Sequence, residues 1–168
     1  GHYMVTEGLA EAIKMAVTSD AKLYDLIKNS TDLKADLPLI IEKSLIIKRD
    51  VVEEDPFEHG KRKILNFGHT IGHAIEAFYM GDYLHGECVA MGMLYVAGPH
   101  LKEDLKDVLK KYGLPTSCSA GADKLMPFIT HDKKAASGGV TIVKSDAPGT
   151  YSIEHASFDD IKELIEKI

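Results

Sequence analysis

Apolar residues recur along most of the chain at the three- and four-residue spacing of amphipathic helices. The predicted helices cover residues 7 to about 26, 37–53, 69 to about 79, 86–97, and a segment around 101–109 that Gly113 and Pro115 end. In the first helix Leu9, Ile13 and Val17 share one stripe, and in the second the apolar residues cover much of the circumference. We therefore expect both helices to be well buried.

The pattern becomes strand-like only after Gly139. Residues 140–143 and the segment around 151–153 predict a short β-hairpin across the turn at 147–149. Ser157 with Asp160 three residues later predicts the capped start of a last helix. We expect one mainly α domain over residues 1–168, with a small β-hairpin near the C-terminus. No Gly-rich phosphate loop follows a strand, so we expect no dinucleotide-binding half within this chain.

Charge and cysteine content narrow the possible partners. The formal net charge of −6 at pH 7 argues against binding to nucleic acid or to an anionic membrane, because both need a concentrated excess of Lys and Arg. No apolar run approaches the ~20 residues of a membrane span, and nothing resembles a signal peptide. Cys88 and Cys118 stand alone, which predicts reduced, buried thiols in a cytoplasmic protein.

Three of the eight histidines, His69, His73 and His85, fall within one short stretch of the chain. His69, His73 and Glu76 lie at i, i+4 and i+7 and share one helix face. Such a cluster is typical of a metal site or an acid/base site, and the alternative is a helix edge with solvated histidines. Nearby glycines at 68 and 72 cost a helix about 1 kcal/mol each relative to alanine, which favours a close approach of another backbone or a ligand.

Several charged residues have two interpretations from sequence alone. Glu11 and Lys14 form either an ordinary surface pair at i, i+3 or part of a site. Lys48 lies on an apolar stripe, so its ammonium must either reach solvent or meet a buried anion. Arg62 precedes His69 by seven residues and offers a fork that suits carboxylate or phosphate. The cationic cluster at 131–134 is either a second anion site or a solvated loop.

Taken together, these motifs resemble the C-terminal, metal-binding and largely helical domain of 3-dehydroquinate synthase. The likeness covers nearly the whole chain and weakens after Gly139. The segments that carry the resemblance are, in chain order, GLAEAIK at 8–14, Arg62, LNFGHTIGHAIE at 65–76, HGECVAMGM at 85–93, GLP at 113–115 and DKK at 132–134.

The resemblance implies a role for each matching position. It implies that Glu11, His69 and His85 bind zinc, or cobalt in its place, and that His73 acts on the substrate instead of the metal. The residues implied to hold the phosphate, carboxylate and hydroxyls of the substrate are Lys14, Lys48, Arg62 and Asn66, with His73 and one of Lys133 and Lys134. Within this set the implied catalytic residues are His73, Lys14 and Arg62.

The implied reaction converts 3-deoxy-D-arabino-heptulosonate 7-phosphate to 3-dehydroquinate and phosphate, in the shikimate pathway of aromatic amino-acid biosynthesis. In the family this lyase uses NAD, bound by an N-terminal domain that this chain lacks. We therefore expect the isolated chain to be inactive, and we leave a homodimer open. The alternatives are a related sugar-phosphate cyclase and a non-catalytic metal-binding module. Polyol dehydrogenases are disfavoured, because they resemble this pattern with an aspartate where Glu11 stands.

Overall fold

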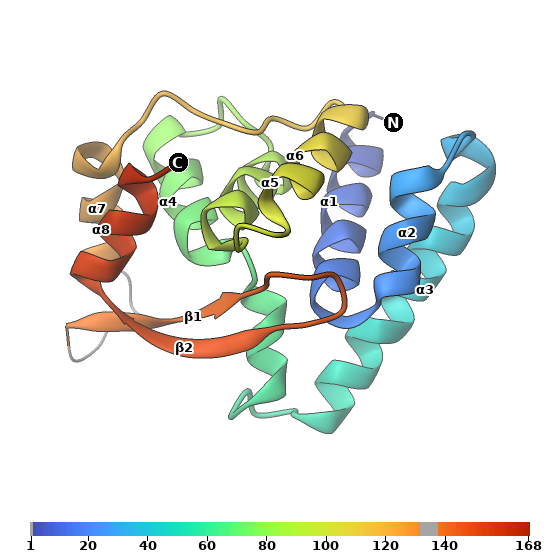
Figure 1. The fold of residues 1–168 in the computed structure, drawn as a ribbon, viewed down its shortest axis with the longest axis horizontal. Helices are drawn as coiled ribbons and strands as arrows, with labels where there is room; N and C mark the ends of the chain where they lie inside the picture. Colours follow the sequence, from blue (N-terminus) through green and yellow to red (C-terminus); the bar gives the residue numbers. More distant parts are fainter. Residues whose placement is uncertain (1, 132–137) are drawn as a thin grey trace.

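The computed structural model of the protein describes residues 2–131 and 138–168, and it is mainly helical (Figure 1). A single two-stranded sheet, near the C-terminus, is the one sheet in these ranges. The predicted fold class, mainly α with a C-terminal β-hairpin, is confirmed. The elements in chain order are α1 His2–Ser19, α2 Ala21–Asn29, α3 Leu33–Glu54, the 3-10 helix η1 Lys61–Asn66, α4 His69–Tyr79, α5 His85–Val96, α6 Lys102–Lys111, α7 Ala122–Thr130, β1 Gly139–Lys144, β2 Ser152–Ser157 and α8 Phe158–Glu166.

Helix α5 is the central element of the fold. Every residue from Cys88 to Val96 on it is buried, and it packs against α1 on one side and α4 on the other (Figure 1). Two apolar clusters form the core. One gathers around α1, α2 and α6, the other around α4, α7, the hairpin and α8, and α5 contributes residues to both. The histidine-bearing helix α4 and the N-terminal end of α5 are thereby held on rigid, buried supports.

Three glycines allow α4 and α5 to cross at close range. A Cβ on Gly92 would lie 2.1 Å from the carbonyl oxygen of Gly68, and a Cβ on Gly72 would lie 3.0 Å from that of Cys88. Gly68 has φ of +77°, a conformation that glycine adopts without strain, and it turns the chain into α4 directly before His69. The close backbone approach that Gly68 and Gly72 predict is confirmed, and α5 supplies the approaching backbone.

The C-terminal hairpin and the last helix follow the sequence prediction. Strands β1 and β2 are antiparallel, with Gly139 paired to Ser157 and Lys144 to Ser152. The connecting loop docks on α1, because the Gly149 N–H donates to the Val17 carbonyl oxygen at 2.8 Å. Ser157 and Asp160 form the expected capping box at the start of α8. Strand β2 is longer than predicted and ends only where α8 begins.

The single helix predicted over residues 7 to about 26 is wrong, because the chain breaks at Asp20 into α1 and α2. The Asp20 carboxylate accepts hydrogen bonds from the N–H groups of Lys22 and Leu23, both at 3.0 Å. This side chain competes with the helical backbone for donors and starts a new helix. The apolar stripe continues across the break, which explains why the pattern reads as one helix.

The expectation that the second helix is well buried is also wrong. Helix α3 begins at Leu33, earlier than predicted, and buries only a narrow face that includes Ile40 and Val51. Leu39, Leu45 and Ile46 remain more than 40 % exposed. The reason is that the main packing partners of α3 are α1, η1 and α2. Although α3 is the longest helix described, neither it nor any other described helix is long and apolar enough to cross a membrane.

Helix α7 and the 3-10 helix η1 have no counterpart in the sequence prediction. In α7 the residues Ala122, Leu125 and Ile129 are buried at helical spacing, so an apolar signal exists. Its shortness and the internal Pro127 hide that signal, since proline normally ends a helix. α7 packs on α4 and forms part of the wall behind the histidines.

Candidate metal centre

The three clustered histidines come together in space as their spacing predicts. His69 and His73 lie on α4, and His85 is the first residue of α5. The ring centroids are 5.1 Å apart for His69 and His73, 5.7 Å for His69 and His85, and 6.0 Å for His73 and His85. Nitrogen donors from two helices therefore face a common space.

The start of α5 is fixed by two carboxylates. Glu87 accepts the Leu84 N–H at 2.8 Å, and Glu7 on α1 accepts the Gly86 N–H at 2.6 Å. Both bonds satisfy helix-terminal donors that would otherwise lack partners. Because His85 lies between these anchored positions, its backbone is held against α1 and α4.

Glu76 contacts His85 directly. Its carboxylate oxygen lies 2.8 Å from His85 Nδ1, and when Nδ1–H donates to it the lone pair of Nε2 is left as the ring's free ligand atom. Side-chain donor atoms of His73, Glu76 and His85 all lie within 4.8 Å of one another, so these three residues also satisfy the spacing of a metal site. Geometry alone thus points to a ligand set in which His73 and Glu76 accompany His85.

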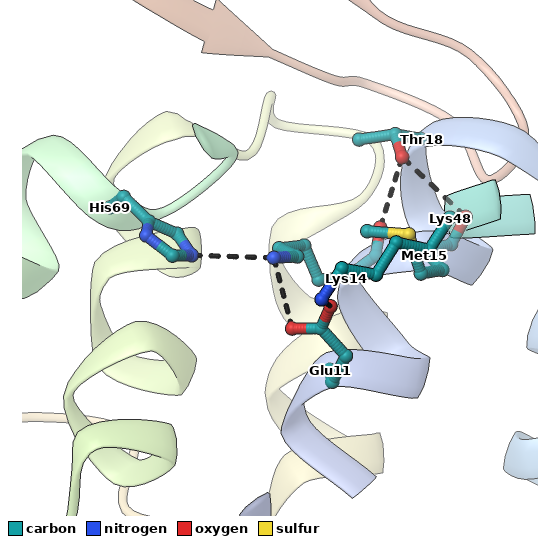
Figure 2. Close-up of polar contacts among 6 residues, drawn as sticks. All are labelled: Glu11, Lys14, Met15, Thr18, Lys48 and His69. Carbon is teal, nitrogen blue, oxygen red and sulfur yellow. Dashed lines mark hydrogen bonds and ion pairs between the residues drawn. The ribbon is translucent and has the colours of Figure 1, made fainter. Parts of the chain in front are cut away.

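A second part of the site connects α1 and α3 to His69 (Figure 2). Lys14 Nζ lies 3.0 Å from Glu11 Oε2 and 3.4 Å from His69 Nε2. Lys48 Nζ approaches Glu11 Oε1 at 3.5 Å. That oxygen is buried and receives no hydrogen bond of acceptable geometry, so the contact with Lys48 is a loose ion pair only. The Thr18 hydroxyl donates to the Lys14 carbonyl oxygen at 3.1 Å one turn further along α1.

Burial and charge act in opposite directions on this pair. Burial raises the pKa of Glu11, but the ammonium groups of Lys14 and Lys48 outweigh it, and the net pKa is lowered. Burial lowers the pKa of Lys14, and its attraction to Glu11 offsets this only in part. Both pKa values are lowered, which favours the charged form of Glu11 and disfavours the charged form of Lys14. Burial prevails only at Lys14 because its side chain is 4 % exposed, whereas that of Glu11 is 33 % exposed. An ordinary surface pair is therefore the wrong interpretation of Glu11 and Lys14.

Asn66 lies beside the histidines. It lines a cavity of about 50 Å³ together with His69, Thr70, His73, Ile129, Val140 and Thr141. The Asn66 side-chain amide donates to Glu58 at 3.5 Å, and Glu58 has a φ of +57°, which is uncommon outside glycine. Glu58 and Thr141 were not identified from sequence, since nothing in their local pattern distinguishes them from surface residues.

Among the described residues, the other predicted cationic side chains, Arg62 and Lys48, contact groups other than the histidines. The Arg62 guanidinium donates to the Pro56 carbonyl oxygen at 2.7 Å, and the Arg62 N–H donates to Asp55 at 3.0 Å. Lys48 meets an anion, Glu11, as one interpretation of its apolar stripe required, but half of its side chain remains exposed. Lys133 and Lys134 lie outside the described residues.

The two cysteines take no part in this site. Both are free thiols, as predicted, although only Cys88 is buried and Cys118 is partly exposed. Burial raises the pKa of the Cys88 thiol to about 12, with nearby carboxylates adding to the effect. A thiol in this state is a poor nucleophile and a poor metal ligand.

Comparison with known proteins decides the family. The family model described as 3-dehydroquinate synthase C-terminal matches residues 8–135. The chain belongs to the 3-dehydroquinate synthase family. The 3-dehydroquinate synthase of Lactococcus lactis subsp. cremoris is 36% identical over 178 residues, covering 96% of this chain and 50% of that protein. The 3-dehydroquinate synthase of Picrophilus torridus is 32% identical over 174 residues, covering 96% of this chain and 51% of that protein. The chain thus spans about half the length of these relatives.

Solved structures show the same fold in related cyclases. A 2-epi-5-epi-valiolone synthase from Streptomyces hygroscopicus subsp. jinggangensis, with NAD+ and Zn2+ bound, superposes with a TM-score of 0.80 at 19% identity, covering 97% of this chain and 50% of that one. A 2-deoxy-scyllo-inosose synthase, complexed with carbaglucose-6-phosphate, NAD+ and Co2+, superposes with a TM-score of 0.79 at 23% identity. The match covers 99% of this chain and 53% of that one. At these identities the likeness establishes the 3-dehydroquinate synthase-like fold.

Proposed function

We propose that this chain is the metal- and substrate-binding half of a 3-dehydroquinate synthase. Joined to an NAD-binding half, it converts 3-deoxy-D-arabino-heptulosonate 7-phosphate to 3-dehydroquinate and phosphate. The observation that carries the proposal is the match of the family model described as 3-dehydroquinate synthase C-terminal to residues 8–135, a range that contains Glu11, His69 and His85. We also place the enzyme in the cytoplasm, in agreement with its free thiols.

Glu11, His69 and His85 suit a divalent cation. Glu11 Oε1 is a buried carboxylate oxygen without a hydrogen-bond donor, the kind of atom that a cation satisfies. His85 keeps Nε2 available because Nδ1 faces Glu76. We favour this set over the one with Glu76, because a carboxylate on the far nitrogen of a ligating histidine typically orients that ring without binding the metal. Three ligands of mixed N and O type leave a position open, as in catalytic zinc sites.

The other residues of the site then bind substrate and move protons. His73 is exposed on the same face as His69, so it can exchange a proton with a substrate hydroxyl or carbon acid. The phosphate and the carboxylate of the substrate need positive charge, which is supplied by Lys14, Lys48, Arg62 and a lysine at 133 or 134. Asn66 supplies an amide for the substrate's hydroxyls. When bound, the cation would supply Lewis acidity that favours ionisation of a substrate hydroxyl.

The cavity beside the histidines indicates that the site needs a further wall. Its volume, about 50 Å³, is well below the roughly 300 Å³ or more that small-molecule sites enclose. We assign that wall, and the binding of NAD, to the other half of the enzyme. The chain alone is then expected neither to bind NAD nor to release phosphate from the sugar phosphate, since hydride transfer needs a positioned nicotinamide. Calorimetric titration with NAD and a phosphate-release assay test this. Zinc-dependent phosphate release by the chain alone would contradict it.

A related sugar-phosphate cyclase is the second candidate, favoured by the fold shared with the valiolone and inosose synthases. Assaying the enzyme that carries both halves with each cyclase substrate separates these activities. A non-catalytic metal-binding module is the third, and it predicts metal binding without turnover in the joined enzyme.

Replacing His85 with alanine is expected to abolish stoichiometric metal binding. The change removes one of three ligands and leaves Glu76 without its partner. Metal content per chain after dialysis against zinc, measured by atomic absorption, gives the result. His100→Ala is the matched control, because His100 Nδ1 also pairs with a carboxylate, that of Asp146 at 2.6 Å, and His100 follows the end of α5 opposite to His85. A full equivalent of zinc on the His85→Ala variant would refute the ligand assignment.

A further inference from the structure

Lys14 makes contacts that its neighbour Lys48 does not. Its ammonium group bridges a carboxylate oxygen of Glu11, at 3.0 Å, and His69 Nε2, at 3.4 Å (Figure 2). An ammonium group can only donate, so His69 must accept through the Nε2 lone pair. Lys48 pairs with the same carboxylate but not with the histidine, and its side chain is 50 % exposed. One cation is therefore built into the site and the other lies at its rim.

The buried position of Lys14 requires this bridge. The residue is 3 % exposed, and its neighbours Ile13 and Met15 are fully buried. A charged amine in such surroundings is costly unless an anion and an acceptor satisfy it. Glu11 and His69 provide both, which explains why the ammonium points toward them and not toward solvent.

A divalent cation bound to Nε2 of His69 would use the same atom that Lys14 contacts. Zinc binds histidine nitrogen at about 2.0–2.1 Å along the lone pair. The ammonium nitrogen lies 3.4 Å from Nε2 as the donor to that same lone pair. The two cations cannot occupy that direction together, because little more than one ångström would separate them.

We propose that Lys14 competes with the divalent cation for Glu11 and His69, so that metal binding displaces its ammonium group and makes it available to an anionic group of the substrate. This rests on the proposed function, since it requires that Glu11, His69 and His85 bind the metal. The metal then replaces Lys14 as the cation that neutralises Glu11. The displaced ammonium group of Lys14, still charged, turns toward the substrate. Loading follows a fixed order, metal first and anionic substrate second.

The test is a Co2+ titration of the chain, followed by the visible absorption of the bound ion. Lys14→Met keeps the length and the apolar stem of the side chain but removes the competing ammonium. We expect the variant to bind Co2+ at least about tenfold more tightly than the wild type. Lys48→Met is the matched control, because it removes a charge from the same carboxylate without touching His69, and we expect a gain of about threefold or less.

Each outcome separates this inference from the proposed function. Equal Co2+ affinity for the wild type and Lys14→Met, or equal gains in Lys14→Met and Lys48→Met, would overturn the competition while leaving the metal site intact. Failure of the wild-type chain to bind Co2+, or undiminished binding by His85→Ala, would overturn the metal site and the competition with it. Circular dichroism checks that Lys14→Met folds, and Lys14→Gln, which retains a polar end for Glu11, is to be titrated in parallel.

Discussion

Gly92→Ala is expected to lower the free energy of unfolding by about 3 kcal/mol or more. The added methyl group would lie 2.1 Å from the Gly68 carbonyl oxygen and 2.7 Å from the Gly72 nitrogen, and both are backbone atoms that cannot rotate away. Helices α4 and α5 must separate to admit it. This loss outweighs the gain of about 1 kcal/mol that alanine brings to a helix interior. Urea denaturation followed by circular dichroism measures the change.

Gly121→Ala is the control for Gly92→Ala. Gly121 is the residue that precedes α7, and the nearest atom to an added Cβ there is an Asp123 carboxylate oxygen at 3.4 Å, which is ordinary contact. We expect its stability to change little. Separation of α4 from α5 moves His69 away from His85, so Gly92→Ala should also weaken Co2+ binding. Unchanged stability in Gly92→Ala would mean that the helix crossing is looser than described.

Lys48→Met, in an enzyme that carries both halves, is expected to lower kcat/KM by about 30- to 1000-fold. This corresponds to about 2 to 4 kcal/mol of lost transition-state binding, the magnitude of a charge-assisted contact to an anionic group. The melting temperature should stay the same or rise slightly, because the ion pair with Glu11 is half-exposed and weak. Steady-state kinetics with the sugar phosphate and thermal melts measure the two effects.

Lys43→Met on the exposed surface of the same helix is the control for Lys48→Met, and it should alter neither quantity. A structural lysine would behave in the opposite way. If Lys48→Met lowered the melting temperature and spared activity, Lys48 would be a packing residue of α3, and the substrate pocket built around it would be wrong.

The histidine region could be predicted from sequence because its constraints are local. The i, i+4 spacing places His69 and His73 on one face, and the glycines at 68 and 72 indicate a close backbone approach. Helix α7 was missed because it is short and contains Pro127. The break at Asp20 was missed because it depends on which of two competing hydrogen-bond patterns prevails. That outcome follows from packing against elements distant in the sequence.

The role of Lys14 was beyond sequence reasoning for a related reason. An i, i+3 spacing from Glu11 predicts a pair, yet it cannot tell a solvated pair from a buried one. Its contact with His69 spans 55 positions and exists only once α1 and α4 are both packed on α5. The exposed apolar face of α3 was likewise unpredictable, since the pattern shows which residues are apolar but not what covers them.

Helix α5 contributes buried residues to both apolar clusters. Neither cluster can lose this helix without the other losing part of its own interior, so we expect the two clusters to melt together. The residues proposed to bind metal lie on α1, α4 and α5, the three helices that meet along this shared element. A cation bound there would tie three helices from distant parts of the sequence together. We therefore expect it to stabilise the entire chain against unfolding instead of one local segment.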